Sequence, residues 1–322
     1  MHDYPPGAFL KGLILVSTTV IFWGILPVAL VFALSVQDGT TITWFRFLVA
    51  ALVCTAYQAW KGRLGEFTRL SLRDWGWLIL AAIFLIGDYL LYIYGLTYID
   101  PSAMQVFSQT TPLFMALGGI IFFKEKLTKL QGLCFVALFA GLGMFFNSAI
   151  SNFEMGEANF IIGAILAVVA SFIWALYAML QKLLADRLSA MNILLFIYIA
   201  AVFSLFPKAE LESFKALTGA DWGILMFCAF NTLVAYNAFS ESLKYWPTTH
   251  ISSVIAITPL ATIVASYVGS RLWPDTVLFA SVNMIGWAGV VLTLVAMVAF
   301  NFRRKPPVLG QVRPRAARAA GR

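Results

Sequence analysis

The chain has 322 residues, of which 61% are apolar and 11% are charged, and its net charge is +7. Soluble proteins carry about 25% charged residues, so this composition excludes a water-soluble fold of this size and predicts a membrane protein. The three cysteines and two histidines form no CxxC pair and no Cys/His cluster. Neither a metal site, a cofactor nor a disulfide is therefore expected.

Ten apolar windows have the length of a helix that crosses a bilayer, about 20 residues. They span residues 10–34, 41–60, 75–98, 102–123, 128–147, 159–181, 190–207, 222–245, 248–270 and 277–301. The first window is too long for the apolar part of a signal peptide and is expected to remain as a membrane helix. Open strands cannot cross lipid, because their backbone groups would lack partners. The predicted fold class is an all-α membrane protein with ten transmembrane helices.

Basic residues are distributed unequally between the two sides that these ten helices would separate. Eighteen of the 22 Lys and Arg residues fall on the side of the N-terminus and three on the opposite side, while Arg46 lies within the second window. Cytoplasmic loops carry such an excess, so both termini are predicted to be cytoplasmic in an inner-membrane protein. The basic tail at 302–322 is expected to contact anionic lipid rather than nucleic acid.

The chain resembles itself after a shift of 147 residues. Matching positions include Tyr89 and Tyr236, Tyr98 and Tyr245, and Thr111-Pro112-Leu113 and Thr258-Pro259-Leu260, while Trp23 and Trp174 match at a shift of 151. The predicted domains are two repeats of five helices, at 10–147 and 159–301. Because five is odd, the second repeat enters the membrane inverted. Many secondary transporters use this arrangement to alternate access to a site near the midplane.

Two prolines, Pro112 and Pro259, lie near the middle of the predicted helices 4 and 9. A proline removes one backbone donor and crowds the carbonyl four residues earlier, which frees the carbonyls at about Ser108 and Ile255. Paired interruptions in inverted halves point to a binding site, although a proline can also kink a membrane helix without any function. We expect kinks at both prolines.

Several short motifs, in their order along the chain, are similar to the EamA family of the drug/metabolite transporter superfamily. They are Trp23-Gly24, Arg46-Phe47, YLLYIYGLTYIDPSAMQVFSQTTPLFMALGGIIFFKEKLT at 89–128, Trp174-Ala175-Leu176-Tyr177 and the two Thr-Pro pairs. The resemblance covers about residues 10–300. It implies a carrier of ten helices in two inverted halves, with helices 1–4 and 6–9 around a central cavity and helices 5 and 10 at the periphery. One departure is Leu272, which stands where the second half would match Glu125.

Asp88 is the sharpest candidate for a functional side chain. It follows Asp74 by fourteen residues, which places it about 21 Å farther along a helix and near the bilayer centre. An acid there is costly and is expected to face protein or water, where it could carry a proton or pair with a substrate ammonium group. The alternative is a protonated Asp that bonds a neighbouring helix. Tyr92, one turn away, shares its face.

Other polar and aromatic side chains are candidates for the cavity wall. Gln105 and Gln109 form a polar stripe with Pro112, and amide groups suit a small polar metabolite; they could equally bond helices together. Trp23 in helix 1 and Trp174 and Tyr177 in helix 6 could stack on aromatic or cationic groups, or could simply pack. Asn231, near the middle of helix 8, completes the predicted substrate-binding set.

Three charged or titratable positions leave alternatives open. Glu241 and His250 lie near the cytoplasmic ends of helices 8 and 9, where they could form a gate or a surface ion pair. Arg46 could turn outward to the membrane surface, pair with Asp38 or Asp100, or bind a substrate carboxylate.

These features together favour a secondary transporter that exports small polar metabolites such as amino acids, with Asp88 as the candidate for coupling to protons. The alternative is an efflux carrier for aromatic or cationic compounds. No nucleophile, metal-protease or ATP-binding motif is found, so an enzyme is not expected. Small residues of helix 9 at Ala261, Ala265 and Gly269 allow close packing, and the chain is expected to be a monomer or a homodimer.

Overall fold

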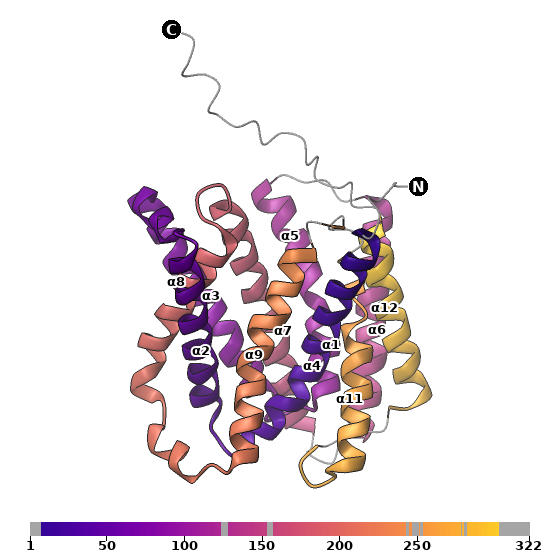
Figure 1. Cartoon of the computed structure of the whole chain (residues 1–322). Coiled ribbons are helices and arrows are strands. Elements are labelled where there is room, and N and C mark those ends of the chain that lie inside the picture. Colours follow the sequence, from indigo (N-terminus) through magenta and orange to yellow (C-terminus); the bar gives the residue numbers. More distant parts are fainter. Residues whose placement is uncertain are drawn as a thin grey trace.

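The computed structural model describes residues 8–123, 128–152, 157–242, 245–246, 251, 254–277, 279 and 282–302. These residues form a bundle of upright helices and contain no strand (Figure 1). The α-helices are α1 (Ala8–Leu34), α2 (Gly39–Trp60), α3 (Leu72–Gly95), α4 (Pro101–Phe107), α5 (Thr111–Phe123), α6 (Lys129–Asn152), α7 (Glu157–Leu184), α8 (Ala190–Leu205), α9 (Gly219–Ser242), α11 (Thr258–Leu272) and α12 (Met284–Phe302). Short 3-10 helices are η1 (Leu64–Arg69), η2 (Ser108–Thr110), η3 (Phe206–Lys208) and η4 (Leu211–Ala216).

Seven helices of the described chain are long and apolar enough to cross a membrane: α1, α2, α3, α6, α7, α8 and α9. The other three predicted windows contain shorter helices. The fourth window is divided into α4 and α5, the ninth contains α11 and the tenth contains α12. The prediction of an all-α membrane protein is confirmed.

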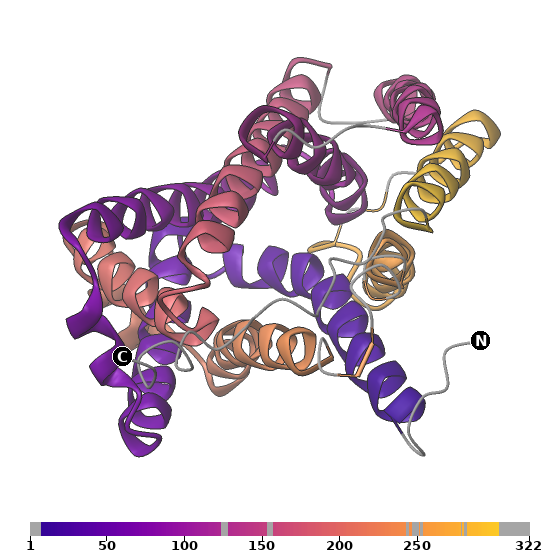
Figure 2. The same ribbon diagram turned by 90° about the horizontal axis from the view of Figure 1, so that it is seen from above.

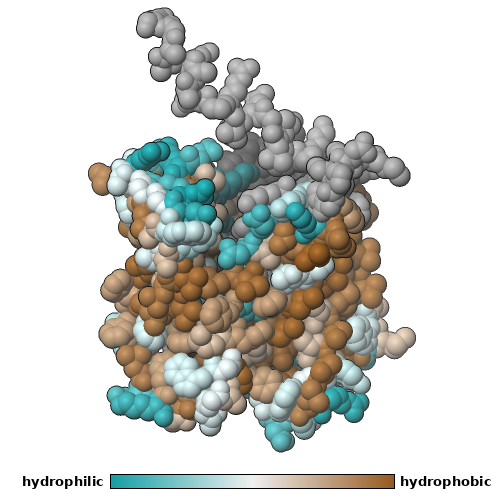
Figure 3. Space-filling model, viewed as in Figure 1, coloured by the Kyte–Doolittle hydropathy of each residue, from teal (hydrophilic) through white to brown (hydrophobic). Residues whose placement is uncertain are grey.

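The face of the bundle drawn in Figure 3 is mostly apolar between two hydrophilic ends. Large apolar side chains point outward along the helices, including Ile83 of α3, 59% exposed, and Val264 of α11, 61% exposed. Such a band would be unfavourable in water and matches the hydrocarbon region of a bilayer. We call the end of the bundle where α1 begins the upper end, as in Figure 1, and the opposite end the lower end.

The helices pack in a regular set of pairs. Along the two sides of the bundle, α1 packs on α9 and α11, while α7 packs on α3 and α5. Helix α2 packs on α8, and α6 packs on α12 at one edge of the bundle (Figure 2). The 147-residue shift relates several bounds: it carries α3 (72–95) onto α9 (219–242) and η1 (64–69) onto η4 (211–216).

The fourth predicted helix is interrupted just before its proline. Helix α4 ends at Phe107, the 3-10 turn η2 follows, and α5 begins at Thr111. The Ser108 carbonyl, which loses its α-helical donor because Pro112 has no N–H, accepts instead from the Thr111 N–H. In the second half, the Thr258 hydroxyl donates to the Ile255 carbonyl at 2.6 Å. The threonine before each proline thus supplies the donor that the proline removes.

Candidate functional site

Arg46 points into the bundle rather than toward a membrane surface. It lies seven residues after the start of α2, is only 3% exposed, and donates from Nη2 to the Thr232 hydroxyl of α9 at 3.0 Å. Its guanidinium lies 4.9 Å from the centre of the Tyr89 ring. The prediction that Arg46 turns outward or pairs with Asp38 or Asp100 is therefore wrong.

The physical reason is that both of those carboxylates already cap helices. Asp38 accepts from the backbone N–H groups of Thr40 and Thr41 at the start of α2. Asp100 accepts from the N–H groups of Ser102 and Ala103 at the start of α4. Capping satisfies donors that a helix start leaves free, and it holds these carboxylates at the lower end.

Asp88 lies on α3, seven residues before the helix ends at Gly95. Its side chain is half-buried, and no hydrogen bond to it is found among the described residues. The charges of Asp88 and Arg46 act on each other, but no N–O pair between them lies within 4.0 Å. The two charges therefore share one region without forming a direct ion pair.

Tyrosine and threonine side chains surround these two charges. We call the set the central polar cluster; it comprises residues that lie close together inside the bundle, namely Arg46, Asp88, Tyr89, Tyr92, Tyr177, Tyr198, Thr232 and Tyr236. Its members come from α2, α3, α7, α8 and α9. The cluster therefore joins five helices that belong to both predicted halves of the chain.

Most of the predicted cavity residues belong to this region. Tyr92 donates to Oε1 of Gln105 at 2.9 Å and so joins α3 to α4. The Trp23 ring meets the Tyr236 ring edge-on, with centroids 5.5 Å apart. Trp174 contacts Tyr177 in the same way, at 6.2 Å.

Two predicted residues have other surroundings. Asn231 donates from Nδ2 to the Phe22 carbonyl at 2.6 Å, which ties α9 to α1. Gln109 lies with Pro259 and Thr293 around a void too small for a water molecule. A 3-10 turn has three residues per turn rather than 3.6, so η2 rotates Gln109 away from the face it would share with Gln105 in an unbroken helix.

The predicted cytoplasmic gate is only partly described. Glu241 is half-buried on α9, and His250 lies outside the described residues. A different polar network joins the two halves at the upper end. It connects Gln58, Arg63, Glu66 and Asp74 with Arg187, Ser189 and Asn192, and we call it the upper clamp.

Asn192 is the centre of the upper clamp and is fully buried. It accepts from Gln58 at 2.7 Å and donates to the Arg63 carbonyl and to Glu66, at 2.9 and 2.8 Å. Glu66 also accepts from the Ser189 N–H at 2.8 Å. The ion pair of Asp74 and Arg187 completes the upper clamp.

A second network, the lower clamp, joins the two halves at the opposite end of the bundle. The Ser213 hydroxyl donates to Gln37 at 2.7 Å, and the Glu210 N–H donates to the Thr41 hydroxyl at 2.8 Å. The Trp44 indole donates to the Val202 carbonyl at 3.1 Å. Neither clamp was predicted from the sequence, because each depends on contacts between segments more than 110 residues apart.

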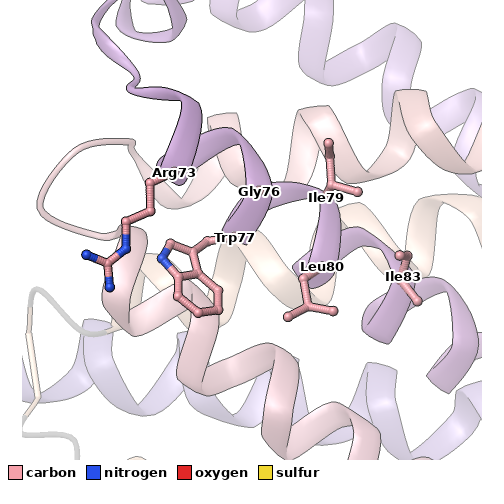
Figure 4. Close-up of a pocket in the computed structure, with 6 residues that line it drawn as sticks. All are labelled: Arg73, Gly76, Trp77, Ile79, Leu80 and Ile83. Atoms are coloured by element: carbon pink, nitrogen blue, oxygen red, sulfur yellow. The ribbon is translucent and has the colours of Figure 1, made fainter.

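A surface groove of about 440 Å³ lies on the outer face of α3 and away from the central polar cluster. Arg73, Trp77 and Leu80 line it with three other α3 residues (Figure 4). Its walls are almost entirely apolar, as expected of a helix face in contact with lipid. Among the described residues, no group of three His, Cys, Asp or Glu side chains could hold a metal ion.

The upper clamp is expected to weaken in acid. Burial acts to raise the pKa of Glu66, but hydrogen bonds from Ser189 and Asn192 and the charge of Arg63 outweigh it and lower the pKa below 4.5. A lowered carboxyl pKa adds stability above the unfolded pKa, and this stability is lost as pH falls through the folded value. The unfolding midpoint should therefore fall as pH drops below about 4.5.

The Glu66→Gln variant should lose part of this acid dependence when its thermal unfolding is followed from neutral to acidic pH. Glu212→Gln is the matched control, because the Glu212 side chain is 86% exposed. If wild type and Glu66→Gln respond to acid with the same slope, Glu66 does not contribute this dependence.

Comparison with known proteins adds family relationships to this geometry. The sequence profile of the EamA-like transporter family matches residues 10–147 and again residues 161–302. An "uncharacterized transporter" of Haemophilus influenzae is 32% identical over 290 residues, which cover 90% of this chain and 94% of that protein. The "uncharacterized inner membrane transporter YhbE" of Escherichia coli is 34% identical over 286 residues, 88% of each chain.

A solved crystal structure has a similar fold. Its TM-score to this chain is 0.60 at 14% sequence identity, with 92% of this chain and 96% of that chain covered. At this identity the likeness concerns the fold alone.

Proposed function

Since the chain belongs to the EamA-like transporter family, we propose that this multi-pass membrane transporter exports small polar metabolites such as amino acids by secondary active transport. The observation that carries the proposal is the central polar cluster, in which Arg46 and Asp88 lie inside the bundle without a direct ion pair. Charged groups inside a membrane protein are costly and commonly serve substrates or ions.

The proposed mechanism is alternating access around a midplane cavity formed by two inverted halves of five helices, at 10–147 and 159–301. Symmetric packing supports it: the contact of α1 with α9 has its counterpart in that of α7 with α3, and the contact of α1 with α11 in that of α7 with α5. The matching bounds of α3 and α9 also support it. With the basic excess on the upper side, we place that side, and both termini, in the cytoplasm.

We further propose that Asp88 carries the coupling proton. It is the acidic member of the central polar cluster, and it retains accessible surface although it lies within the bundle. A carboxyl group that faces a cavity can take up and release a proton as access alternates. Tyr92 and Gln105, which are hydrogen-bonded beside it, would form part of the cavity wall.

Asp88→Asn is expected to keep exchange of solute, with weaker affinity for solutes that carry an ammonium group. It should lose pH-driven accumulation, because asparagine cannot release a proton. Purified protein in liposomes would be tested for counterflow of labelled amino acids, and then for net uptake under an imposed pH gradient. Asp186→Asn, at an exposed loop position, is the matched control. If Asp88→Asn accumulates solute as the wild type does, Asp88 is structural and the coupling proposal fails.

Efflux of aromatic or cationic compounds is the second candidate, and the aromatic walls favour it. Trp23, Trp174 and the cluster tyrosines offer ring faces and edges that could bind cations. In the same liposomes, movement of a cationic dye without exchange of any amino acid would support this function instead.

A further inference from the structure

We infer that Arg46 binds the carboxylate of the transported solute, so that the site selects solutes that carry an anionic group and rejects simple cations. This inference rests on the proposed transport function and assigns the anion-binding residue of the same site. Arginine suits the role because its planar guanidinium presents several donors that match a carboxylate.

The partners of Arg46 do not neutralise its charge. Thr232 accepts one hydrogen bond and Tyr89 offers a ring face, but both are uncharged. The buried Nε donor of Arg46 has no partner among the described residues. Buried donors are nearly always satisfied, and a buried cation is costly unless it is paired. A solute carboxylate would supply both the acceptor and the opposite charge.

Asp88 does not supply that pair. A structural ion pair inside a protein needs close contact and good geometry to offset the loss of water. Asp88 and Arg46 interact only at longer range, and Asp88 keeps accessible surface. Two separated opposite charges in one cluster suit a solute with two charged ends, the carboxylate at Arg46 and an ammonium group at Asp88.

The internal repeat distinguishes residues that both halves share from residues that occur in one half only. The aromatic frame recurs in both halves: Tyr89 corresponds to Tyr236, and Trp23 to Trp174. The two charges do not recur. At the shift of 151 that relates the starts of α2 and α8, Arg46 corresponds to Ile197. At 147, Asp88 corresponds to Ala235.

The same helices therefore pack in the second half with apolar residues at both charged positions. Phe47 and Tyr198, which also correspond at 151, stack on each other with centroids 5.5 Å apart. This contact and that of Tyr89 with Tyr236 mark a shared structural frame at the interface of the halves. The charges are additions to that frame, which favours a role in recognition.

The test uses competitors that differ in one charged group. Counterflow of a labelled mixture of amino acids would be challenged with unlabelled amino acids, with their N-acetyl derivatives, which keep only the carboxylate, and with their amides, which keep only the ammonium group. The first two sets should inhibit the wild type, and the amides should not.

Arg46→Gln should raise the apparent KM about tenfold or more, because a charge-assisted hydrogen bond is lost, with a smaller change in maximal rate. Arg46→Lys should restore part of the affinity.

Arg271→Gln is the matched control, since Arg271 also lies over a tyrosine ring, 5.4 Å from the centre of Tyr267, but at an exposed position. It should behave as wild type. Arg46→Met provides a second variant if Arg46→Gln folds poorly, because replacing a buried charge by an apolar side chain of similar size is often tolerated.

The outcomes separate this inference from the transport proposal. Unchanged affinity in Arg46→Gln, or equal inhibition by amides and N-acetyl derivatives, overturns the role of Arg46 while transport stands. If the wild type exchanges neither amino acids nor a cationic dye, the transport proposal fails, and binding is then measured by thermal stabilisation with the same three sets. The inference is supported if carboxylate compounds stabilise the wild type and do not stabilise Arg46→Gln. It is overturned if they do not stabilise the wild type.

Discussion

Replacing Asn192 with alanine is expected to lower the free energy of unfolding by about 2–4 kcal/mol. The substitution removes three hydrogen bonds. It leaves the fully buried Gln58 with only the Ser189 hydroxyl, at 3.5 Å, and the Arg63 carbonyl with only the Glu66 N–H. A buried polar group left unsatisfied costs about 1–3 kcal/mol. Unfolding of the purified protein in detergent, followed by tryptophan fluorescence, would measure the change.

Asn237→Ala is the matched control, because Asn237 is exposed on α9 and its replacement should change stability by less than about 0.5 kcal/mol. A second comparison combines Asn192→Ala with Gln58→Ala. Since both residues belong to one network, their effects should not add. Equal stability of Asn192→Ala and wild type would show that the upper clamp does not hold the halves together.

The two clamps have matching positions in the repeat. The shift of 147 residues carries Glu66 of η1 onto Ser213 of η4. Glu66 accepts a hydrogen bond from Ser189 of the second half, and Ser213 donates one to Gln37 of the first half. Both clamps are formed in the same conformation. A gate that alternates must open at one end while it closes at the other, so we assign the clamps to the fixed frame of the bundle. Asn192→Ala should therefore affect stability more than the rate of transport.

The helices could be predicted from the sequence because lipid leaves few choices. Every backbone group in the hydrocarbon region needs an internal partner, so long apolar windows such as 159–181 become helices, here α7. The neighbourhood of Asp88, Tyr92 and Gln105 was predictable for a related reason. An acid within an apolar window is expected to face polar groups, and two adjacent windows supply them.

Arg46 shows what helical spacing cannot predict. Its direction depends on Thr232, which is 186 residues away in the sequence, and on the capping roles that occupy Asp38 and Asp100. Two signals were nevertheless present. Arg46 is a charge inside an apolar window, and its counterpart in the second half is Ile197. Asn192 was harder to recognise, because an asparagine at the start of a helix resembles an ordinary capping residue.

Replacing Gly141 with alanine is expected to destabilise the protein by about 2–3 kcal/mol, because it forces α6 and α12 apart. A Cβ atom at this position would lie 2.7 Å from the Gly289 carbonyl oxygen and 2.9 Å from the Thr293 nitrogen, both backbone atoms of α12. Overpacking of a tight contact costs about 1–3 kcal/mol, and backbone atoms cannot move aside as a flexible side chain can. The same detergent unfolding measurement would show the loss.

Gly143 offers a control on the same helix, two residues away. A Cβ atom there would meet nothing within 4 Å, so Gly143→Ala should leave stability unchanged or raise it by up to about 1 kcal/mol through helix propensity. The two variants make the same glycine-to-alanine change in the same helix. Stability changes of opposite sign would therefore locate the α6–α12 contact at Gly141. If both variants are stabilised, α12 does not lie against α6 at this position in the membrane protein, and the packing at that edge of the bundle must be different.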